Sequence, residues 1–109
     1  MSKKLTKKIK PKKTSRNTSR EKYILKLFVT GILPNSVRAV INIKDICEKR
    51  LKGMYDLEII DIYQQPSLAL TEDIVAIPLL IKKLPLPEAR LIGDLSNTER
   101  VLEALNIIN

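Results

Sequence analysis

The stretch from residue 23 to residue 62 constrains the fold of this chain more than any other feature. It begins with YILKLFV, a run that is largely apolar on both alternating faces, as in a central strand covered on both sides. A turn around Gly31 and Pro34 follows, and a helical pattern then continues to about Lys52. The run YDLEIIDI at 55–62 is a second strand. A strand, a long helix and a strand predict a right-handed βαβ unit with two parallel strands.

The helix in this unit is amphipathic and has recognisable ends. Asn35 or Ser36 is expected to cap its first turn, because a short side-chain oxygen can accept a free backbone N–H there. Gly53 is expected to end the helix in a left-handed conformation. Its apolar positions recur at spacings of three and four residues: Val37, Val40, Ile43, Cys47 and Leu51. Cys47 lies in this stripe, away from groups that would lower its pKa, so we expect a buried structural thiol.

The second half of the chain predicts a short helix followed by an antiparallel hairpin. The helix covers residues 67–73, and the first strand of the hairpin covers 75–84. Pro78 falls within that strand and must occupy its start or an edge, because proline cannot donate a ladder hydrogen bond. A stiff Leu-Pro-Leu-Pro turn at 84–87 leads to a last strand at 90–92.

The closing helix begins after Ser96 and Glu99, which are expected to form a capping box in which each side chain bonds to the other's backbone N–H. The resulting order, β-α-β-α-β-β-α, predicts an α/β domain with thioredoxin-like topology. Residues 87–92 also suit a first helical turn, because proline is favourable at the first helical position. The sequence therefore determines the secondary structure of the second half less firmly than that of the first half. Such a conflict between local patterns marks either a function or an alternative fold.

Positive charge is concentrated at the N-terminal end. The first 20 residues hold nine of the 20 lysines and arginines and none of the 12 acids, so the other 89 residues carry 11 cations against 12 acids. Such a segment buries too little apolar surface to offset its ordering entropy, so we expect a disordered basic tail at 1–20 and one folded domain at 21–109. The tail is either a solubilising extension or an electrostatic arm for nucleic acid, an anionic membrane or an acidic protein.

Composition excludes several classes of protein. Cys47 is the only cysteine, which excludes an internal disulfide and fits a cytoplasmic location. No apolar run approaches the roughly 20 residues of a membrane helix. The chain has no histidine, no cysteine pair and no glycine-rich loop, so we expect no enzyme activity, no cofactor and no metal site. Asp61 and Asp94 are the carboxylates that merit inspection, and we interpret them as strand-end or turn residues.

An RNA-binding interpretation rests on residues 27–32, LFVTGI, which resemble the first ribonucleoprotein motif of an RNA-recognition domain. That module stacks bases on several aromatic side chains of its sheet. The chain has only three tyrosines and one phenylalanine. The residues that faintly resemble the second ribonucleoprotein motif, KGMY at 52–55, would fall on the wrong strand. The sequence therefore favours a class of protein other than an RNA-recognition domain.

Several segments in a fixed order resemble the KaiB family of the cyanobacterial circadian clock. These are YILKLFVTG at 23–31, PNSVRA at 34–39, LEIIDI at 57–62 with Pro66, AIP at 76–78, and RLIGDLSN at 90–97. The last is the most specific, and the resemblance covers about 22–109. It implies a non-enzymatic regulator that binds a KaiC-like hexameric ATPase and modulates its phosphorylation and ATPase cycle, in a clock or in signalling derived from one.

The resemblance also implies a metamorphic protein, with a resting fold, dimeric or tetrameric, in which the C-terminal half differs from the thioredoxin-like form. Carried over residue by residue, the fold-switch positions are Pro78, Pro85, Pro87, Gly93 and Asp94. Leu86 stands where relatives often have another proline, and Gln64-Gln65 also departs from the common pattern. The partner-binding residues are expected near the end of the first helix and the second strand: Lys52, Tyr55 and Gln64.

Two other functions remain as alternatives. A nucleic-acid-binding protein would act through the basic tail, and its binding would weaken steeply with salt. A thioredoxin-type redox enzyme would depend on Cys47, although the chain lacks the second cysteine of such a site.

Overall fold

The computed structural model describes residues 22–31 and 33–107. The prediction of a disordered tail at 1–20 lies outside the described residues. Within them the predicted order of elements is confirmed: β1 (Tyr23–Val29), α1 (Pro34–Arg50), β2 (Tyr55–Asp61), α2 (Pro66–Thr71), β3 (Leu79–Leu84), β4 (Ala89–Ile92) and α3 (Thr98–Ala104). None of the helices in this part of the chain is long and apolar enough to cross a membrane.

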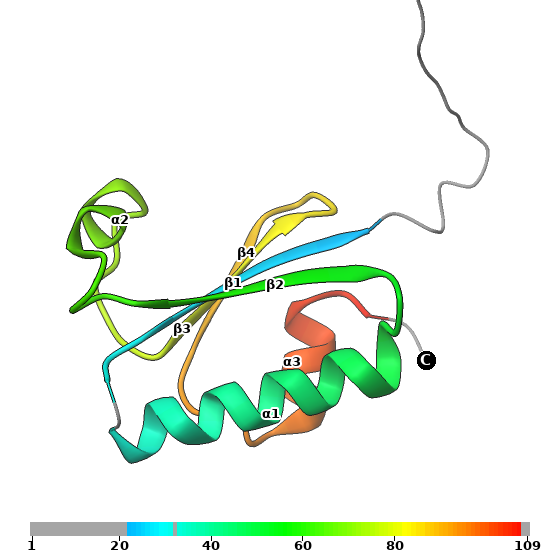
Figure 1. Ribbon diagram of the computed structural model, residues 1–109. Coiled ribbons are helices and arrows are strands. Elements are labelled where there is room, and N and C mark those ends of the chain that lie inside the picture. Colours follow the sequence, from blue (N-terminus) through cyan, green and yellow to red (C-terminus); the bar gives the residue numbers. More distant parts are fainter. Residues whose placement is uncertain (1–21, 32, 108–109) are drawn as a thin grey trace, which may run out of the picture.

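The four strands form one mixed sheet in the order β2-β1-β3-β4 (Figure 1). Strands β1 and β2 are parallel, with Tyr23 opposite Tyr55 and Val29 opposite Asp61. Strand β3 runs antiparallel to β1, and β4 runs antiparallel to β3. The sheet therefore consists of the predicted parallel βαβ unit joined to an antiparallel hairpin.

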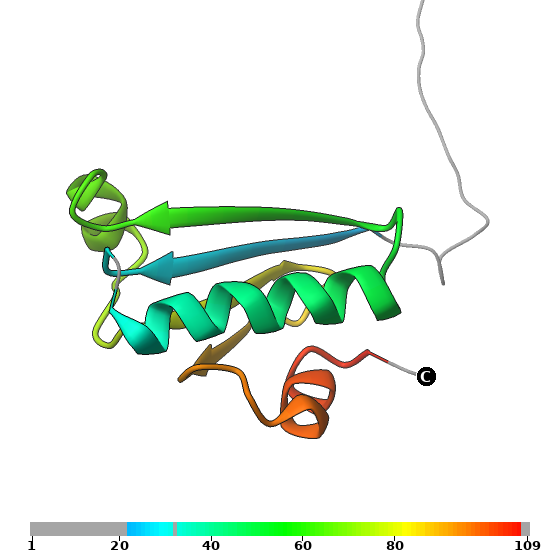
Figure 2. The same cartoon turned by 60° about the horizontal axis from the view of Figure 1, so that its bottom comes forward.

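Helices α1 and α3 cover one face of the sheet, and α2 lies at the end of the other face (Figures 1 and 2). The larger core fills the space under α1 and α3, and a smaller cluster of Phe28, Ile60, Leu79 and Ile81 packs against Leu68 of α2 and its neighbours. Burying each such side chain stabilises the fold by about 1.5–3 kcal/mol. Because β1 supplies Leu27 to one face and Phe28 to the other, it is the central, doubly covered strand that its sequence predicts.

The start of α1 differs from the prediction. The N-cap residue is Leu33, which provides no side-chain cap, and Pro34 begins the helix, so a cap by Asn35 or Ser36 is wrong. The Ser36 Oγ instead accepts a hydrogen bond from the backbone N–H of Thr30 (3.1 Å). Proline suits this position because its missing N–H needs no partner in the first turn.

The buried face of α1 is rotated from the predicted stripe. Val37 is 43% exposed, and the buried positions are Ser36, Ala39, Ile43, Ile46 and Cys47. The helix ends at Arg50, and Gly53 has φ +77, which confirms the predicted left-handed residue beyond the helix.

The hairpin begins later than its sequence pattern predicts. Strand β3 starts at Leu79, directly after Pro78, so the proline stands at the start of the strand as expected. Val75 is 84% exposed and lies outside the sheet, so a strand from 75 is too long. Residues 89–92 form β4, which excludes the alternative of a helical turn at 87–92.

The predicted capping box of Ser96 and Glu99 is wrong. The cap of α3 is Asn97, whose side-chain oxygen accepts a hydrogen bond from the backbone N–H of Arg100 (3.1 Å). The backbone N–H of Ser96 donates to Asp94 Oδ1 (3.0 Å), so Ser96 belongs to the loop before the cap.

Candidate functional site

The residues carried over as fold-switch positions divide between two ends of the hairpin. Pro78 and Gly93 meet at one end, where the Gly93 N–H donates to the Pro78 carbonyl oxygen (3.0 Å), and Asp94 follows directly. Pro85 and Pro87 belong to the connection between β3 and β4 at the opposite end. The structure therefore brings three of the five together.

Asp94 is the centre of the first group. Its Oδ2 accepts a hydrogen bond from Arg38 Nε (3.1 Å), and its backbone oxygen accepts one from Asn42 Nδ2 (2.8 Å). Hydrogen bonds from the side chain and backbone of Ser96, together with that from Arg38, hold the pKa of the Asp94 carboxyl below its usual range. These contacts attach α1 to the connection between β4 and α3.

The three residues expected to bind a partner do not form one patch. Lys52 is exposed just beyond α1, and Tyr55 begins β2, where its hydroxyl donates to Glu48 Oε2 (2.7 Å). This bond raises the pKa of Tyr55 to about 12. Gln64 is exposed beyond the other end of β2, and seven strand residues separate the two ends by about 20 Å. A partner that contacts all three would therefore span the length of β2.

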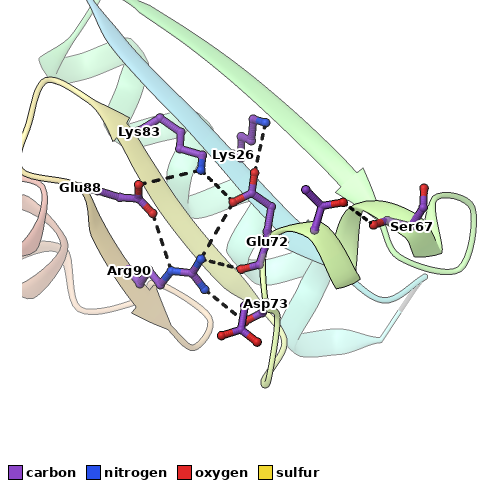
Figure 3. A network of polar contacts seen from close by, with 8 residues as sticks. Lys26, Ser67, Glu72, Asp73, Lys83, Glu88 and Arg90 are labelled. Carbon is purple, nitrogen blue, oxygen red and sulfur yellow. Dashed lines mark hydrogen bonds and ion pairs between the residues drawn. The ribbon is translucent and has the colours of Figure 1, made fainter.

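A charged cluster on the second face of the sheet escaped the sequence analysis (Figure 3). Glu72, just after α2, contacts Lys83 of β3 (2.8 Å), Lys26 of β1 (3.6 Å) and Arg90 of β4 (4.0 Å). The Arg90 guanidinium also donates to the backbone oxygens of Glu72 (2.6 Å) and Asp73 (3.3 Å). The cluster thus connects the end of α2 to three strands.

The hydrogen bond from Lys83 is the main reason that the pKa of Glu72 lies below its usual range. A sequence signal for this cluster existed, because Lys26 is a lysine within an otherwise apolar central strand. Such a residue needs a counter-charge when its face is covered, but its partner cannot be read from local spacing.

Cys47 and Asp61, two of the residues that the sequence analysis examined for chemistry, both have structural surroundings. Cys47 is fully buried, and burial followed by the nearby charge of Glu48 raises its pKa to about 12, so the prediction of a structural thiol is confirmed. Asp61 accepts a hydrogen bond from the Tyr63 N–H (2.9 Å), as expected of a strand-end carboxylate. No group of three or more potential metal ligands occurs within the described part of the chain.

Lys82 is a buried charged residue that the sequence analysis missed. It is 1% exposed, and its Nζ donates to the backbone oxygen of Leu105 at the end of α3 (3.3 Å). Burial lowers the pKa of this amine. Its position on β3 points it into the larger core beneath α3, where it joins the end of that helix to the sheet.

Comparison with known proteins identifies close relatives. A family model described as the KaiB domain matches residues 26–107. The chain is 49% identical over 89 residues to the circadian clock oscillator protein KaiB of Thermostichus vulcanus, covering 82% of each chain. It is equally similar to the KaiB protein of Synechococcus elongatus, covering 82% of this chain and 87% of that one.

Two solved structures show the same fold. Chloroplastic thioredoxin z has a TM-score of 0.65 at 17% identity, with 82% of each chain covered. The N-terminal domain of Synechococcus elongatus SasA has a TM-score of 0.65 at 23% identity, with 96% of this chain and 94% of that one covered. The predicted thioredoxin-like α/β fold is therefore confirmed.

Proposed function

This chain belongs to the KaiB family, and from that premise we propose that it is a non-enzymatic regulator that binds a KaiC-like hexameric ATPase. It modulates the phosphorylation and ATPase cycle of that partner, in a circadian clock or in signalling derived from one. The observation that carries the proposal is the 49% identity to clock oscillator proteins across 82% of the chain.

The chemistry of the described residues supports a binding role. In this thioredoxin-like frame the single cysteine is buried, and its pKa of about 12 leaves almost no thiolate at neutral pH. The start of α1 carries Leu33, Pro34 and Asn35 and no cysteine. These observations support binding of a partner through the protein's surface, because the single thiol is not reactive.

A change of fold is part of the proposal. The hairpin and α3 would repack in a resting dimer or tetramer, with Pro78, Pro85, Pro87, Gly93 and Asp94 as the positions that accommodate the change. In support, the ion pair of Arg38 and Asp94 is partly exposed, so it can be exchanged at small cost. Two packings of one sequence need differ by only a few kcal/mol for such a switch.

Native mass spectrometry of the full chain with a KaiC-type ATPase hexamer from the same organism, in the presence of ATP, tests the proposal. We expect a stoichiometric complex that forms over hours, and the free protein should show a dimer or tetramer. Absence of any complex would refute the proposed partnership. Lys52→Glu, which reverses a charge, and Gln64→Ala, which shortens a side chain, should each weaken the complex. Cys47→Ala should leave it unchanged.

The uneven charge supports a second candidate, binding of nucleic acid through the tail. Nine of the 20 cations lie in the first 20 residues without an acid. A fluorescent single-stranded oligonucleotide should then bind the full chain with a steep salt dependence, and deletion of residues 1–20 should abolish binding. Equal binding by the shortened chain would exclude the tail as the binding segment.

A further inference from the structure

The second face of the sheet, the one that carries α2, is covered over only part of its length. Figure 1 shows α2 at one end of this face, and no other helix of the described residues lies there. Toward the opposite end is a hollow of about 390 Å³, lined by Lys22, Ile24, Leu84, Pro85 and Leu86. Leu84 is 47% exposed and Leu86 is 74% exposed. A concave surface with exposed apolar walls is typical of a binding site.

Two acidic side chains of β2 lie beside this hollow. Asp56 is opposite Ile24 in the register of β1 and β2, and neighbours in register share a face of the sheet. Glu58 is opposite Lys26, which belongs to the charged cluster of the second face (Figure 3). Asp56 forms an ion pair with Lys22 (3.1 Å), whereas the exposed Glu58 has no cation partner among the described residues. A cation from another segment can therefore pair with Glu58.

The segment that precedes Lys22 is well placed to cover this surface, because Lys22 itself lines the hollow. Residues 1–20 carry nine cations and no acid, and their branched apolar side chains are Leu5 and Ile9. The 13 residues from Ile9 to Lys22 (22 − 9) span roughly 20 Å as a flexible coil, and more where the cations repel one another. The hollow is within that reach. Tethering gives an effective concentration of the order of 1 mM, so weak contacts suffice for docking.

We propose that the tail at 1–20 folds back onto the second face of its own domain. Leu5 and Ile9 occupy the hollow, and the lysines beside them lie next to Glu58. Such a segment cannot bury enough apolar surface by itself, but the hollow lets it do so against the domain. The inference goes beyond the proposed function, because it gives the tail a docking site on this chain.

Paramagnetic relaxation enhancement in the ¹⁵N-labelled full chain tests the proposal. A nitroxide is attached through Thr6→Cys, between Leu5 and Ile9, in a chain whose own thiol is removed by Cys47→Ala. We expect loss of amide signal around the hollow, at Ile24, Glu58, Leu84 and Leu86, and none in α3. The loss should diminish at 1 M salt, because the screening length falls from about 10 Å at 0.1 M to about 3 Å.

Three substitutions make the test specific. Glu58→Lys reverses the unpaired charge beside the hollow, and Leu86→Ser removes part of the apolar wall, so each should reduce the loss of signal. Glu103→Lys is the matched control for the charge. Glu103 is an exposed glutamate of α3, on the other face, and it also has no ion-pair partner in the described part of the chain, so the loss should be unchanged. The dispersion of the same spectra shows that each variant is folded.

A mixture of two chains separates docking within one molecule from docking between molecules. One chain carries the nitroxide without ¹⁵N, and the other carries ¹⁵N without the nitroxide. We expect no loss of signal in this mixture. Loss of signal there, loss spread evenly over the domain, or equal effects of Glu58→Lys and Glu103→Lys would overturn the proposal.

Discussion

The Nε atom of Arg38 lies 3.1 Å from Oδ2 of Asp94, and this contact joins α1 to the connection after β4 across 56 positions of sequence. An isolated pair with this exposure contributes little, typically below about 1 kcal/mol. Here Asn42 and Ser96 bond to the same aspartate, so the pair belongs to a small network that holds the loop.

Asp94→Asn should therefore lower the free energy of unfolding slightly at neutral pH, because it removes the charge while keeping the shape. Urea unfolding measures this change. A double-mutant cycle with Arg38→Gln isolates the pair, and a coupling free energy of zero would show that the contact contributes nothing to stability.

Glu72→Gln should destabilise the fold by about 1–3 kcal/mol at pH 7, because a carboxylate only 13% exposed loses its charge while three cations remain around it. Glu88→Gln is the matched control. Its carboxylate is 43% exposed and contacts Lys83 and Arg90 only at 3.9 Å, so its loss should be small. Equal effects of the two substitutions on urea unfolding would contradict a central role for Glu72.

The same residue should make stability depend on pH. The pKa of Glu72 is lower in the folded chain than its ordinary value of about 4.3, so its stabilisation is complete above that value and is lost as pH falls through the folded pKa. Urea unfolding between pH 3 and pH 7 should show a shallower acid loss in Glu72→Gln than in the unaltered chain. Asp94 titrates in the same direction, so the difference between the two proteins is the quantity to compare.

Lys82→Met should change stability by less than about 1 kcal/mol, because methionine fills a similar volume and removes a buried amine that has no acidic partner in the described chain. Lys82→Ala should cost about 2–4 kcal/mol, because it leaves a cavity. Thermal or urea unfolding of both variants separates packing from charge. A loss in Lys82→Met as large as that in Lys82→Ala would show that the bond to Leu105 matters more than volume.

The Lys82 amine also predicts an alkaline effect. Its pKa is lower in the folded chain, so it contributes stability that rises as pH increases from the folded pKa towards the unfolded value of about 10.4. The raised pKa values of Cys47 and Tyr55 act in the opposite direction. The comparison is therefore between the unaltered chain and Lys82→Met at each pH, and identical profiles would contradict the prediction.

Gly93→Ala should lower the free energy of unfolding by about 1–3 kcal/mol, because φ is +123 there, although a Cβ would meet no atom within 4 Å. Gly53→Asn is the matched control. Its φ of +77 lies in the left-handed region that asparagine tolerates, so a smaller loss is expected. Equal losses by urea unfolding would show that backbone strain at Gly93 is not the cause.

Local patterns in the sequence were sufficient to predict the elements and their order. The alternation in residues 23–29 marked a central strand because both faces of β1 are covered, by α1 and α3 on one side and by α2 on the other. The burial of Cys47 followed from its place in a helical apolar stripe. The left-handed Gly53 followed from its place just beyond that helix. Each of these inferences depends on residues within one or two turns of each other.

Choices between neighbouring residues depended on the tertiary structure. Ser36 and Ser96 are plausible helix caps by sequence, but Ser36 bonds to Thr30 and the Ser96 N–H bonds to Asp94. The cap of α3 is instead Asn97, which the sequence analysis did not single out. The hollow that Leu33 and Ile77 line arises in the same way, because these residues meet only when β3 pairs with β1.

The charged contacts were decided by the tertiary structure alone. Glu72 meets Lys26, Lys83 and Arg90 because strand pairing places those three cations side by side on one face and α2 ends above them. Lys82 enters the core because the register of β3 turns it towards α3. Sequence periodicity tells which face a residue occupies, but strand pairing selects its neighbours from distant parts of the chain, and those neighbours determine its charge and hydrogen bonding.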